Sequence, residues 1–497
     1  VSMFSMESLL SGLMIFCYLA QVDAARILVY IPTPSISHQV IPRPLVKELV
    51  KRGHEVTFVT TDPSYEKGKA PANLTEIDVH DISYQHFEDI LLHHNGNPSE
   101  VLGQITKLFN RFATIADLQL QTPEFQEILK KPKDHFDVLI LEAINRVSIG
   151  LSEKFKAPVI QLSSLGTVSS HYEYLGAPSH PFLFPTPLSQ RIYNLSRWEK
   201  VSQIIKEIIL TYFLEHTMEF DMNIIRKHFG KNADLRKLGR NIKLLLINEH
   251  PIWAENRPIP PNIKYIGGIH QTELKSFLDS SKNGVIYMSL GTNVMTSILP
   301  ENIKEIIFNV FSKLPYDILL KWDDDEIPVQ PSNVKVQKWY PQSTLLKHPK
   351  IKLFITQGGL QSTDEAIDAG VPLLAIPMLG DQWYNAEKYV RHKIVFITFY
   401  SYKQNMLRLR SLMRDHPIQP VDLAVWWTEH IIKYGGDHLI PPSAYLHWTE
   451  YYEVELILIC LSVALATLCL LFYVSKYLLK ALTGLLNFDV RIKTKFE

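Results

Sequence analysis

A dense group of glycine, aromatic and polar residues lies between Trp339 and Asn385. A strand-like run ends at Thr356, the pair Gly358 and Gly359 follows, and a helical pattern begins at once. Glycine lets the backbone approach a ligand closely, and the free N–H groups at the start of a helix attract anions. This order of strand, glycine pair and helix therefore predicts a site for a phosphate group.

The side chains around this turn suit a nucleotide that carries a sugar. Ser362 adds a hydroxyl donor, and Glu365, one helical turn further on, is placed to accept hydrogen bonds from the two hydroxyls of a ribose. Asp381 and Gln382 follow the next strand-like run, at the end of the strand where ligands of α/β proteins lie. Trp339 offers a flat ring on which a base can stack. Together these residues predict a site for a nucleotide diphosphate sugar.

The same stretch resembles the signature of the UDP-glycosyltransferase family, the membrane-bound enzymes of animals. The shared motifs are, in chain order, W-x-P-Q, F-I-T-x-G-G, S-x-x-E, G-V-P and D-Q-x-x-N. The resemblance covers nearly the whole chain. It implies the GT-B fold, an α/β architecture in which two Rossmann-like domains face a cleft. In this family the N-terminal domain binds the acceptor and the C-terminal domain binds the UDP-sugar.

The resemblance also gives roles to residues of the donor site. Uracil is expected to stack on Trp339, with Gln342 and Glu365 at the nucleoside and Asp381 and Gln382 at the sugar. The other expected donor contacts, most of them near the diphosphate, are Ser289, Gly291, Thr292, Gln357, Gly358, Gly359 and Ser362.

A general base is expected from the N-terminal half of the chain, because the acceptor hydroxyl must lose its proton as it attacks the anomeric carbon. His38 follows the first strand-like run beside the start of a helix, whose field disfavours an imidazolium. It aligns with the catalytic histidine of the family. The family pairs that histidine with an aspartate, and here the sixth residue after Phe136 is Glu142, a carboxylate with one more methylene group.

The chain departs from the family pattern at two places. Gln357 stands where the family often has a histidine, so this position brings an amide donor without a positive charge. After Tyr389 the family continues through a strand and a helix that this chain lacks between Lys393 and Leu409. The short segment is either a real deletion or an error in the gene model. It leaves open a second interpretation, a membrane glycoprotein that binds a ligand or partner but has lost turnover.

Strand-like and helical segments alternate along the chain, which predicts two α/β domains with parallel sheets. The strands are expected at residues 26–31, 55–60, 136–141, 158–162, 284–290, 317–321, 334–338, 352–356 and 373–376. A proline-rich segment at 255–261 separates the halves. The expected domain bounds are therefore 25–260 and 261–450.

Both ends of the chain carry apolar segments. Residues 1–24 resemble a secretory signal peptide. Residues 455–475 are apolar enough for a membrane-spanning helix, and the basic tail at 476–497 predicts a cytosolic end with the rest of the chain in the lumen. Lys493 and Lys495 fit a K-x-K-x-x retrieval signal, so a single-pass type I protein of the endoplasmic reticulum membrane is expected. The sequons at Asn73 and Asn194 fit lumenal exposure.

Composition argues against other classes of protein. The chain has 51 Lys plus Arg and 51 Asp plus Glu, without the basic surplus of a nucleic-acid binder. The three cysteines, Cys17, Cys460 and Cys469, all lie in the apolar end segments, so neither a cysteine nucleophile nor cysteine metal ligands are expected. No G-x-G-x-x-G opens either half, which argues against a nicotinamide-dependent oxidoreductase.

The residues and the resemblance together imply an inverting, metal-independent hexosyltransferase of the detoxifying kind. We expect it to transfer glucose from UDP-glucose to hydroxyl groups of small lipophilic acceptors, although the sequence leaves glucuronic acid open as the sugar. The UDP-sugar is a co-substrate, and no cofactor or metal is expected. The reasons are that no D-x-D is expected near a donor strand and that a helix N-terminus can stabilise the departing UDP. Membrane lipid is a further expected partner, and the sequence leaves open whether the chain forms a homo-oligomer.

Overall fold

The structure, a computed structural model, describes residues 24–87, 101–167, 169–189, 191–269, 281, 283–292, 294, 296, 299–323, 331–394 and 399–493. The chain divides into two compact units, Val1–Pro442 and Ser443–Glu497. The expected signal peptide, except for its last residue, lies outside the described residues, and so do Lys495 and the side chain of Lys493.

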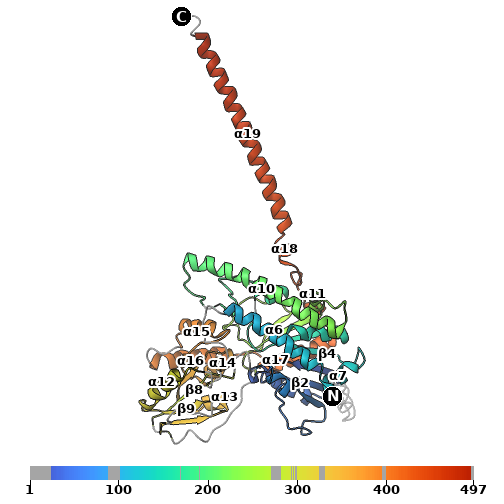
Figure 1. The fold of residues 1–497 in the computed structure, drawn as a ribbon, viewed down its shortest axis with the longest axis vertical. Coiled ribbons are helices and arrows are strands. Elements are labelled where there is room, and N and C mark those ends of the chain that lie inside the picture. Colours follow the sequence, from blue (N-terminus) through green and yellow to red (C-terminus); the bar gives the residue numbers. More distant parts are fainter. Residues whose placement is uncertain are drawn as a thin grey trace, which may run out of the picture. The chain divides into compact units, whose positions relative to one another are not determined.

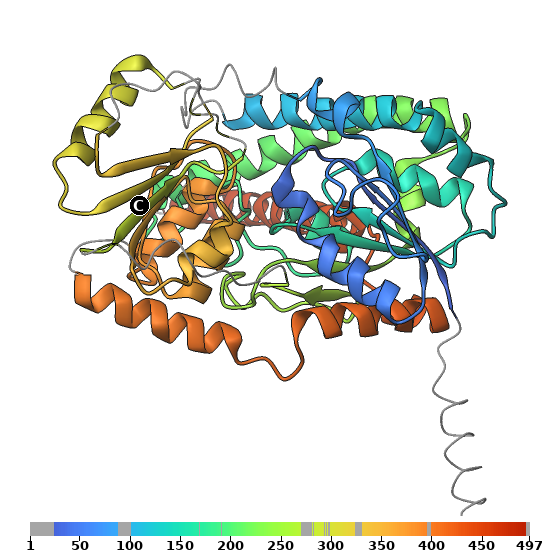
Figure 2. The same ribbon diagram turned by 90° about the horizontal axis from the view of Figure 1, so that it is seen from below.

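Within the described residues, the first unit contains a seven-stranded parallel sheet in the order β3-β2-β1-β4-β5-β6-β7 (Figures 1 and 2). Its strands are β1 (Arg26–Ile31), β2 (Glu55–Thr60), β3 (Leu74–Asp78), β4 (Val138–Glu142), β5 (Val159–Ser163), β6 (Ile242–Ile247) and β7 (Ile263–Tyr265). The central strands are buried, largely apolar runs, apart from the exposed Arg26 that begins β1, as expected for a parallel sheet covered on both faces. Strand β7 follows the proline-rich segment, so this sheet extends past the expected boundary at residue 260.

Helices connect and cover these strands. They are α2 (Ile36–Gln39), α3 (Pro42–Lys51), α4 (His80–Tyr84), α6 (Val101–Leu120), α7 (Pro123–Lys130), η2 (Arg146–Gly150), α8 (Leu151–Lys154), α9 (Ser169–Tyr174), α10 (Arg197–Phe229), α11 (Leu235–Leu238) and η3 (Gly239–Asn241). The longest of them, α10, begins with a capping box in which Ser196 and Glu199 satisfy each other's backbone N–H groups. It packs against α6 and η2.

A second parallel sheet, of five strands in the described residues, has the order β10-β9-β8-β11-β12. Its strands are β8 (Val285–Ser289), β9 (Asp317–Lys321), β10 (Val334–Gln337), β11 (Ile351–Thr356) and β12 (Leu373–Ala375), and its helices are α12 (Glu301–Ser312), α13 (Gln342–Leu346), α14 (Leu360–Ala369), α15 (Gln382–Arg391) and α16 (Phe399–Arg414). Alternate residues of β8 enter different cores, Tyr287 on one face and Met288 on the other. The two predicted α/β sheets are thus both present.

The chain returns to the first sheet after α16. Helix α17 (Pro420–Tyr434) and the short η6 (Asp437–Leu439) follow it, and Ala424, Val425 and Ile431 join the core beneath β1 and α3. Arg52 of the N-terminal half pairs with Glu429 of α17 at 3.1 Å. The segment that lies C-terminal to the second sheet in sequence therefore stabilises the first sheet.

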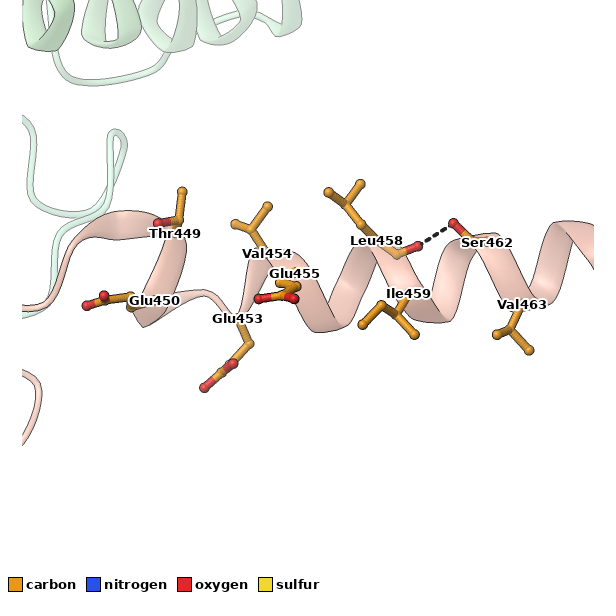
Figure 3. Close-up of a pocket in the computed structure, with 9 residues that line it drawn as sticks. All are labelled: Thr449, Glu450, Glu453, Val454, Glu455, Leu458, Ile459, Ser462 and Val463. Carbon is orange, nitrogen blue, oxygen red and sulfur yellow. Dashed lines mark hydrogen bonds between the residues drawn. The ribbon is translucent and has the colours of Figure 1, made fainter.

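The second unit consists of α18 (Trp448–Tyr451) and α19 (Val454–Lys493). Residues Val454–Lys480 are long and apolar enough to cross a membrane by length and composition, and none of this stretch is buried. Figure 3 shows the groove on this unit, lined only by residues of α18, α19 and their junction, from Thr449 to Val463. None of the residues predicted to do chemistry lies in it.

Candidate active site

His38 and Glu142 meet at the carboxyl ends of two neighbouring strands, β1 and β4. Nδ1 of His38 lies 2.5 Å from Oε1 of Glu142, and both side chains are buried. The same Nδ1 lies 2.9 Å from the hydroxyl of Ser164, which follows β5. Because Nδ1 is turned toward these partners, Nε2 is the ring nitrogen available to take a proton from a substrate hydroxyl. This is the geometry of a general base oriented by a carboxylate.

A helix begins beside His38, but it is a single turn. His38 belongs to α2, which has only four residues, and α3 begins at Pro42. A helix this short has little field. The residues that orient the ring are therefore Glu142 and Ser164.

Gln342 connects the residues expected at the nucleoside. Its side-chain amide donates to the hydroxyl of Ser362 at 2.9 Å and to Oε2 of Glu365 at 2.7 Å, while its oxygen accepts from the hydroxyl of Tyr287 at 3.2 Å. Burial raises the pKa of the Glu365 carboxyl to about 7. An ionised Glu365 held in this way can accept hydrogen bonds from vicinal hydroxyls, as the sequence predicted for a ribose.

The glycine turn after β11 lies against the loop after β8. Gly358 has a φ of 92° and Gly359 is the N-cap of α14, so this turn presents the N-terminus of α14, the end of a helix that attracts anions. The Asp381 carboxylate accepts a hydrogen bond there from the backbone N–H of Leu360. Gly291 has a φ of 79°, and the side chain of Gln357 leaves no room for a Cβ there. Gln357 thus packs the two loops together. Ser289, at the end of β8, pairs with Thr356 at the end of β11, and Thr292 lies in the loop after β8.

Asp381 and Gln382 lie at the end of the second sheet where α15 begins. The oxygen of Gln382 accepts from the backbone N–H groups of Met378 and Leu379, at 2.7 and 2.8 Å, so its amide N–H groups are the part free to meet a sugar. Burial raises the pKa of the Asp381 carboxyl to about 6.

The structure adds Asn385 to the site, a residue given no role by the sequence analysis. Its amide nitrogen donates to Asp381 at 2.8 Å and to the carbonyl of Gly358 at 2.8 Å, and its oxygen accepts from Nε1 of Trp253 at 3.1 Å. Asn385 therefore fixes the Asp381 carboxylate relative to the glycine turn at Gly358. Its place as the last residue of D-Q-x-x-N was the available signal.

Lys321 is a second residue that sequence reasoning missed. Its ammonium group donates to the carbonyl of Gly291 at 2.5 Å and lies 5.3 Å from the centre of the Trp339 ring. Burial lowers the pKa of this ammonium. The Lys321 ammonium thus lies between the loop after β8 and the exposed Trp339 ring, which is expected to stack on uracil. A lysine that ends the strand next to β8 could have indicated it.

Residues of both sheets meet at this site. The amide of Gln361, in the first turn of α14, donates to the carbonyl of Ser37, next to His38. Leu379 and Trp383 flank Asp381 and Gln382 in the sequence. Leu379 packs on Phe87 and Phe112, and Trp383 packs on a cluster formed by α10 side chains. The donor-binding half therefore contacts apolar side chains of the N-terminal half close to the expected sugar position.

The asparagines of the two sequons differ in exposure. Asn73 is half-buried, and its amide nitrogen donates to the carbonyls of Val50 and His54, both at 2.8 Å. Asn194 is exposed.

The expectation that no D-x-D lies near a donor strand is wrong. Asp323, Asp324 and Asp325 form a D-x-D one residue after β9. The Asp323 carboxylate accepts hydrogen bonds from the backbone N–H and the hydroxyl of Thr296.

The first parallel sheet carries a histidine oriented by a carboxylate, and the second carries a glycine turn of the kind that binds nucleotides. This combination is that of a GT-B glycosyltransferase. The fold is similar to that of the glycotransferase of kitacinnamycin, with a TM-score of 0.56 and 19% identity over 82% of this chain and 99% of that one. The fold is also similar to that of a UDP-glucosyltransferase from Polygonum tinctorium capable of glucosylating indoxyl. The TM-score is 0.53 and the identity 14%, over 83% of this chain and 99% of that one. At these identities the likeness concerns the fold alone.

The sequence places the chain more narrowly. The family model described as UDP-glucoronosyl and UDP-glucosyl transferase matches residues 25–400 and 393–491. The chain is 33% identical to an ecdysteroid UDP-glucosyltransferase of Spodoptera littoralis nuclear polyhedrosis virus, covering 88% of this chain and 93% of the relative. It is 29% identical to UDP-glucosyltransferase 2 of Dactylopius coccus, covering 93% of each. The chain therefore belongs to this family and is an enzyme that transfers a sugar from a UDP-sugar.

The family match is interrupted in the segment after Tyr389, which is shorter than the family pattern predicts. Its two segments overlap at residues 393–400. In the structure α15 ends at Arg391 and α16 begins at Phe399, with residues 395–398 outside the described residues. All the expected donor-binding residues lie before this point.

Proposed function

We propose that this enzyme transfers glucose from UDP-glucose to a hydroxyl group of a small lipophilic acceptor, with inversion at the anomeric carbon and without a metal. His38 takes the hydroxyl proton through Nε2 as the oxygen attacks, and Glu142 stabilises the imidazolium that forms. The N-terminus of α14 and Lys321 stabilise the charge on the departing UDP. The observation that carries this proposal is the buried contact of 2.5 Å between His38 and Glu142.

The charges near Asp381 favour glucose over glucuronic acid. Asp381 lies in the field of Glu249, a second buried carboxylate, whose pKa is raised by burial. The buried ammonium of Lys388 lies 3.7 Å from a different carboxylate, that of Glu255. A uronate carboxylate placed beside Asp381 and Glu249 would meet like charges, whereas the neutral CH₂OH of glucose would not. The names of the relatives, UDP-glucosyltransferases, point the same way.

The acceptor is proposed to be lipophilic because of the side chains beside the sugar position. Leu379 contacts Phe87 and Phe112, and Trp383 contacts Leu210 and Leu214. Apolar side chains exclude water and favour an apolar acceptor body. Relatives are named for ecdysteroid glucosylation, so a polycyclic alcohol of the steroid type is a suitable first acceptor.

The test is an acceptor screen on the detergent-solubilised full chain with UDP-glucose and UDP-glucuronic acid, measuring both UDP release and glycoside formation. We expect glycoside formation with UDP-glucose on steroid and phenol hydroxyls. Exclusive use of UDP-glucuronic acid would refute the choice of sugar.

A second candidate function is a ligand-binding membrane glycoprotein without turnover. One observation favours it, the break of the family match at residues 393–400. If this candidate holds, the full chain binds UDP by calorimetry, but no acceptor in the screen stimulates UDP release. Donor binding together with turnover rejects it.

We also propose that α19 anchors the enzyme in the endoplasmic reticulum membrane with the active site in the lumen. The apolar stretch Val454–Lys480 and the basic residues after it support this orientation. The variant carrying Lys493→Ser and Lys495→Ser keeps α19 but loses the K-x-K-x-x pattern. Its glycans should become resistant to endoglycosidase H, and glycans that stay fully sensitive would leave the tail as a plain anchor.

A further inference from the structure

We propose that Thr33 is a positioning residue for catalysis, which acts by holding the Glu142 carboxylate against His38. Thr33 lies in the loop after β1 and is 1% exposed. Its backbone N–H donates to Oε2 of Glu142 at 3.1 Å, and its hydroxyl donates to the same oxygen at 2.6 Å. The inference rests on the proposed role of His38 as general base and names a residue through which that role is maintained.

The two oxygens of Glu142 have separate tasks. Oε1 faces Nδ1 of His38, and within the described residues both hydrogen bonds to Oε2 come from Thr33. A glutamate side chain has three rotatable bonds, so a buried glutamate needs fixed partners to keep its carboxylate in one orientation. A carboxylate that is 2% exposed also needs hydrogen bonds in place of water. Thr33 meets both needs with one residue.

The loop itself is built to keep Thr33 in place. Pro34 follows it, which restricts Thr33 to extended backbone conformations. The carbonyl of Thr33 accepts hydrogen bonds from the side-chain amide of Gln39 and the backbone N–H of Ser35, both at 2.8 Å. Gln39 is in turn held by the hydroxyl of Thr60 at 2.7 Å. The two donors of Thr33 thus reach Glu142 from a rigid support.

The hydroxyl can be removed without a change of shape. In Thr33→Val the backbone N–H still reaches Oε2, but the charge-assisted bond from the hydroxyl is lost. We expect kcat to fall by about tenfold, the factor that corresponds to one lost hydrogen bond to a charged group. The KM for UDP-glucose and the affinity for UDP should stay within about twofold, because Thr33 has no donor-binding role. Thr33→Ser, which keeps the hydroxyl, should restore most of the lost kcat.

Thr60→Val is the matched control. It removes a buried threonine hydroxyl that supports the same loop through Gln39 but has no bond to Glu142. If Thr60→Val lowers kcat as much as Thr33→Val, the effect comes from the loop and the inference is wrong. Should Thr33→Val fail to fold, as judged by thermal unfolding, Thr33→Ala gives the same comparison.

A double-mutant cycle with Glu142→Gln tests whether Thr33 acts through the carboxylate. In the Glu142→Gln background we expect Thr33→Val to lower kcat by a further factor of less than about two, since the effects of coupled residues are not additive. An equal loss in both backgrounds would overturn the inference. If wild type lacks turnover, or if His38→Ala retains it, the proposed function fails instead. If Thr33→Val has a normal kcat while His38→Ala has a low one, only the role of Thr33 is rejected.

Discussion

Gln361 donates a hydrogen bond from its side-chain amide to the backbone carbonyl of Ser37, and so joins the first turn of α14 to the loop that carries His38. The helix that is expected to hold the diphosphate and the loop that holds the proposed base therefore share a direct contact. Such a contact can set the distance between the anomeric carbon and the attacking oxygen.

Loss of this contact should affect turnover more than donor binding. We expect Gln361→Ala to lower kcat about fivefold, since a typical hydrogen bond contributes about 1 kcal/mol, while UDP affinity by calorimetry stays within about twofold. Gln121→Ala is the control, because the amide of Gln121 donates to Asp117 within the N-terminal half. Equal losses of UDP affinity and kcat in Gln361→Ala would show that Gln361 belongs to the donor site instead.

The donor residues should divide between nucleotide and sugar. Trp339→Ala should weaken free UDP about tenfold or more, since base stacking contributes roughly 1–3 kcal/mol, and Glu365→Ala should also weaken it. Asp381→Ala should spare UDP and impair the use of UDP-glucose. Calorimetry with both ligands measures this, and a similar loss of UDP affinity in all three variants contradicts the division.

Donor affinity should depend on pH through Glu365. Burial raises the pKa of this carboxyl to about 7, so it is ionised above that pH and protonated below it. Only the ionised form can accept hydrogen bonds from both ribose hydroxyls, so affinity for UDP-glucose should fall as the pH is lowered from about 8 to about 6.5. UDP-glucose is the better probe, because its diphosphate has no terminal group that titrates in this range.

Glu365→Gln serves as the control for this pH dependence. Its affinity for UDP-glucose should be weaker and nearly flat around pH 7. A remaining decrease at lower pH belongs to Asp381, whose pKa burial raises to about 6. An unchanged pH dependence in Glu365→Gln would remove Glu365 from the ribose site.

The two sequons should behave differently. Asn194 is exposed, whereas the Asn73 amide donates two hydrogen bonds to backbone carbonyls, and a glycan would replace one of its two hydrogens. Asn194→Gln should remove a mass shift that is sensitive to peptide N-glycosidase. Asn73→Gln should leave that shift in place but lower the free energy of unfolding by about 1–3 kcal/mol. Loss of the shift in Asn73→Gln would reverse the assignment.

Much of the fold was predictable because it depends on local patterns. The bounds of β1, β2 and β9 agree with the predicted strands, since buried parallel strands are short apolar runs with polar ends. Strands β3, β6 and β7 were not predicted. The sequence of β3, LTEID, is half polar because the strand lies at a sheet edge, and α17 packs on the first sheet through long-range contacts that no local pattern shows.

The candidate site was predictable in its membership and less so in its internal contacts. The motif order indicated Gln342, Ser362 and Glu365, which the structure brings into one hydrogen-bonded group. Thr33 and Lys321 carry no motif, because their roles depend on which strands are neighbours and where their side chains end. The helix field assigned to His38 has little strength in the structure, because the helical pattern did not show that α2 and α3 are separate.

The central claim is that His38 is the general base of a UDP-glucose-dependent transfer. The most direct measurement is kcat for glycoside formation by wild type and His38→Ala, with UDP affinity measured on the same preparations. We predict that kcat falls by about 10²-fold or more, the usual contribution of a general base, while UDP affinity changes by less than about twofold. Glu142→Gln should reduce kcat by a smaller factor. Near-normal kcat in His38→Ala, with UDP still bound, would contradict the account.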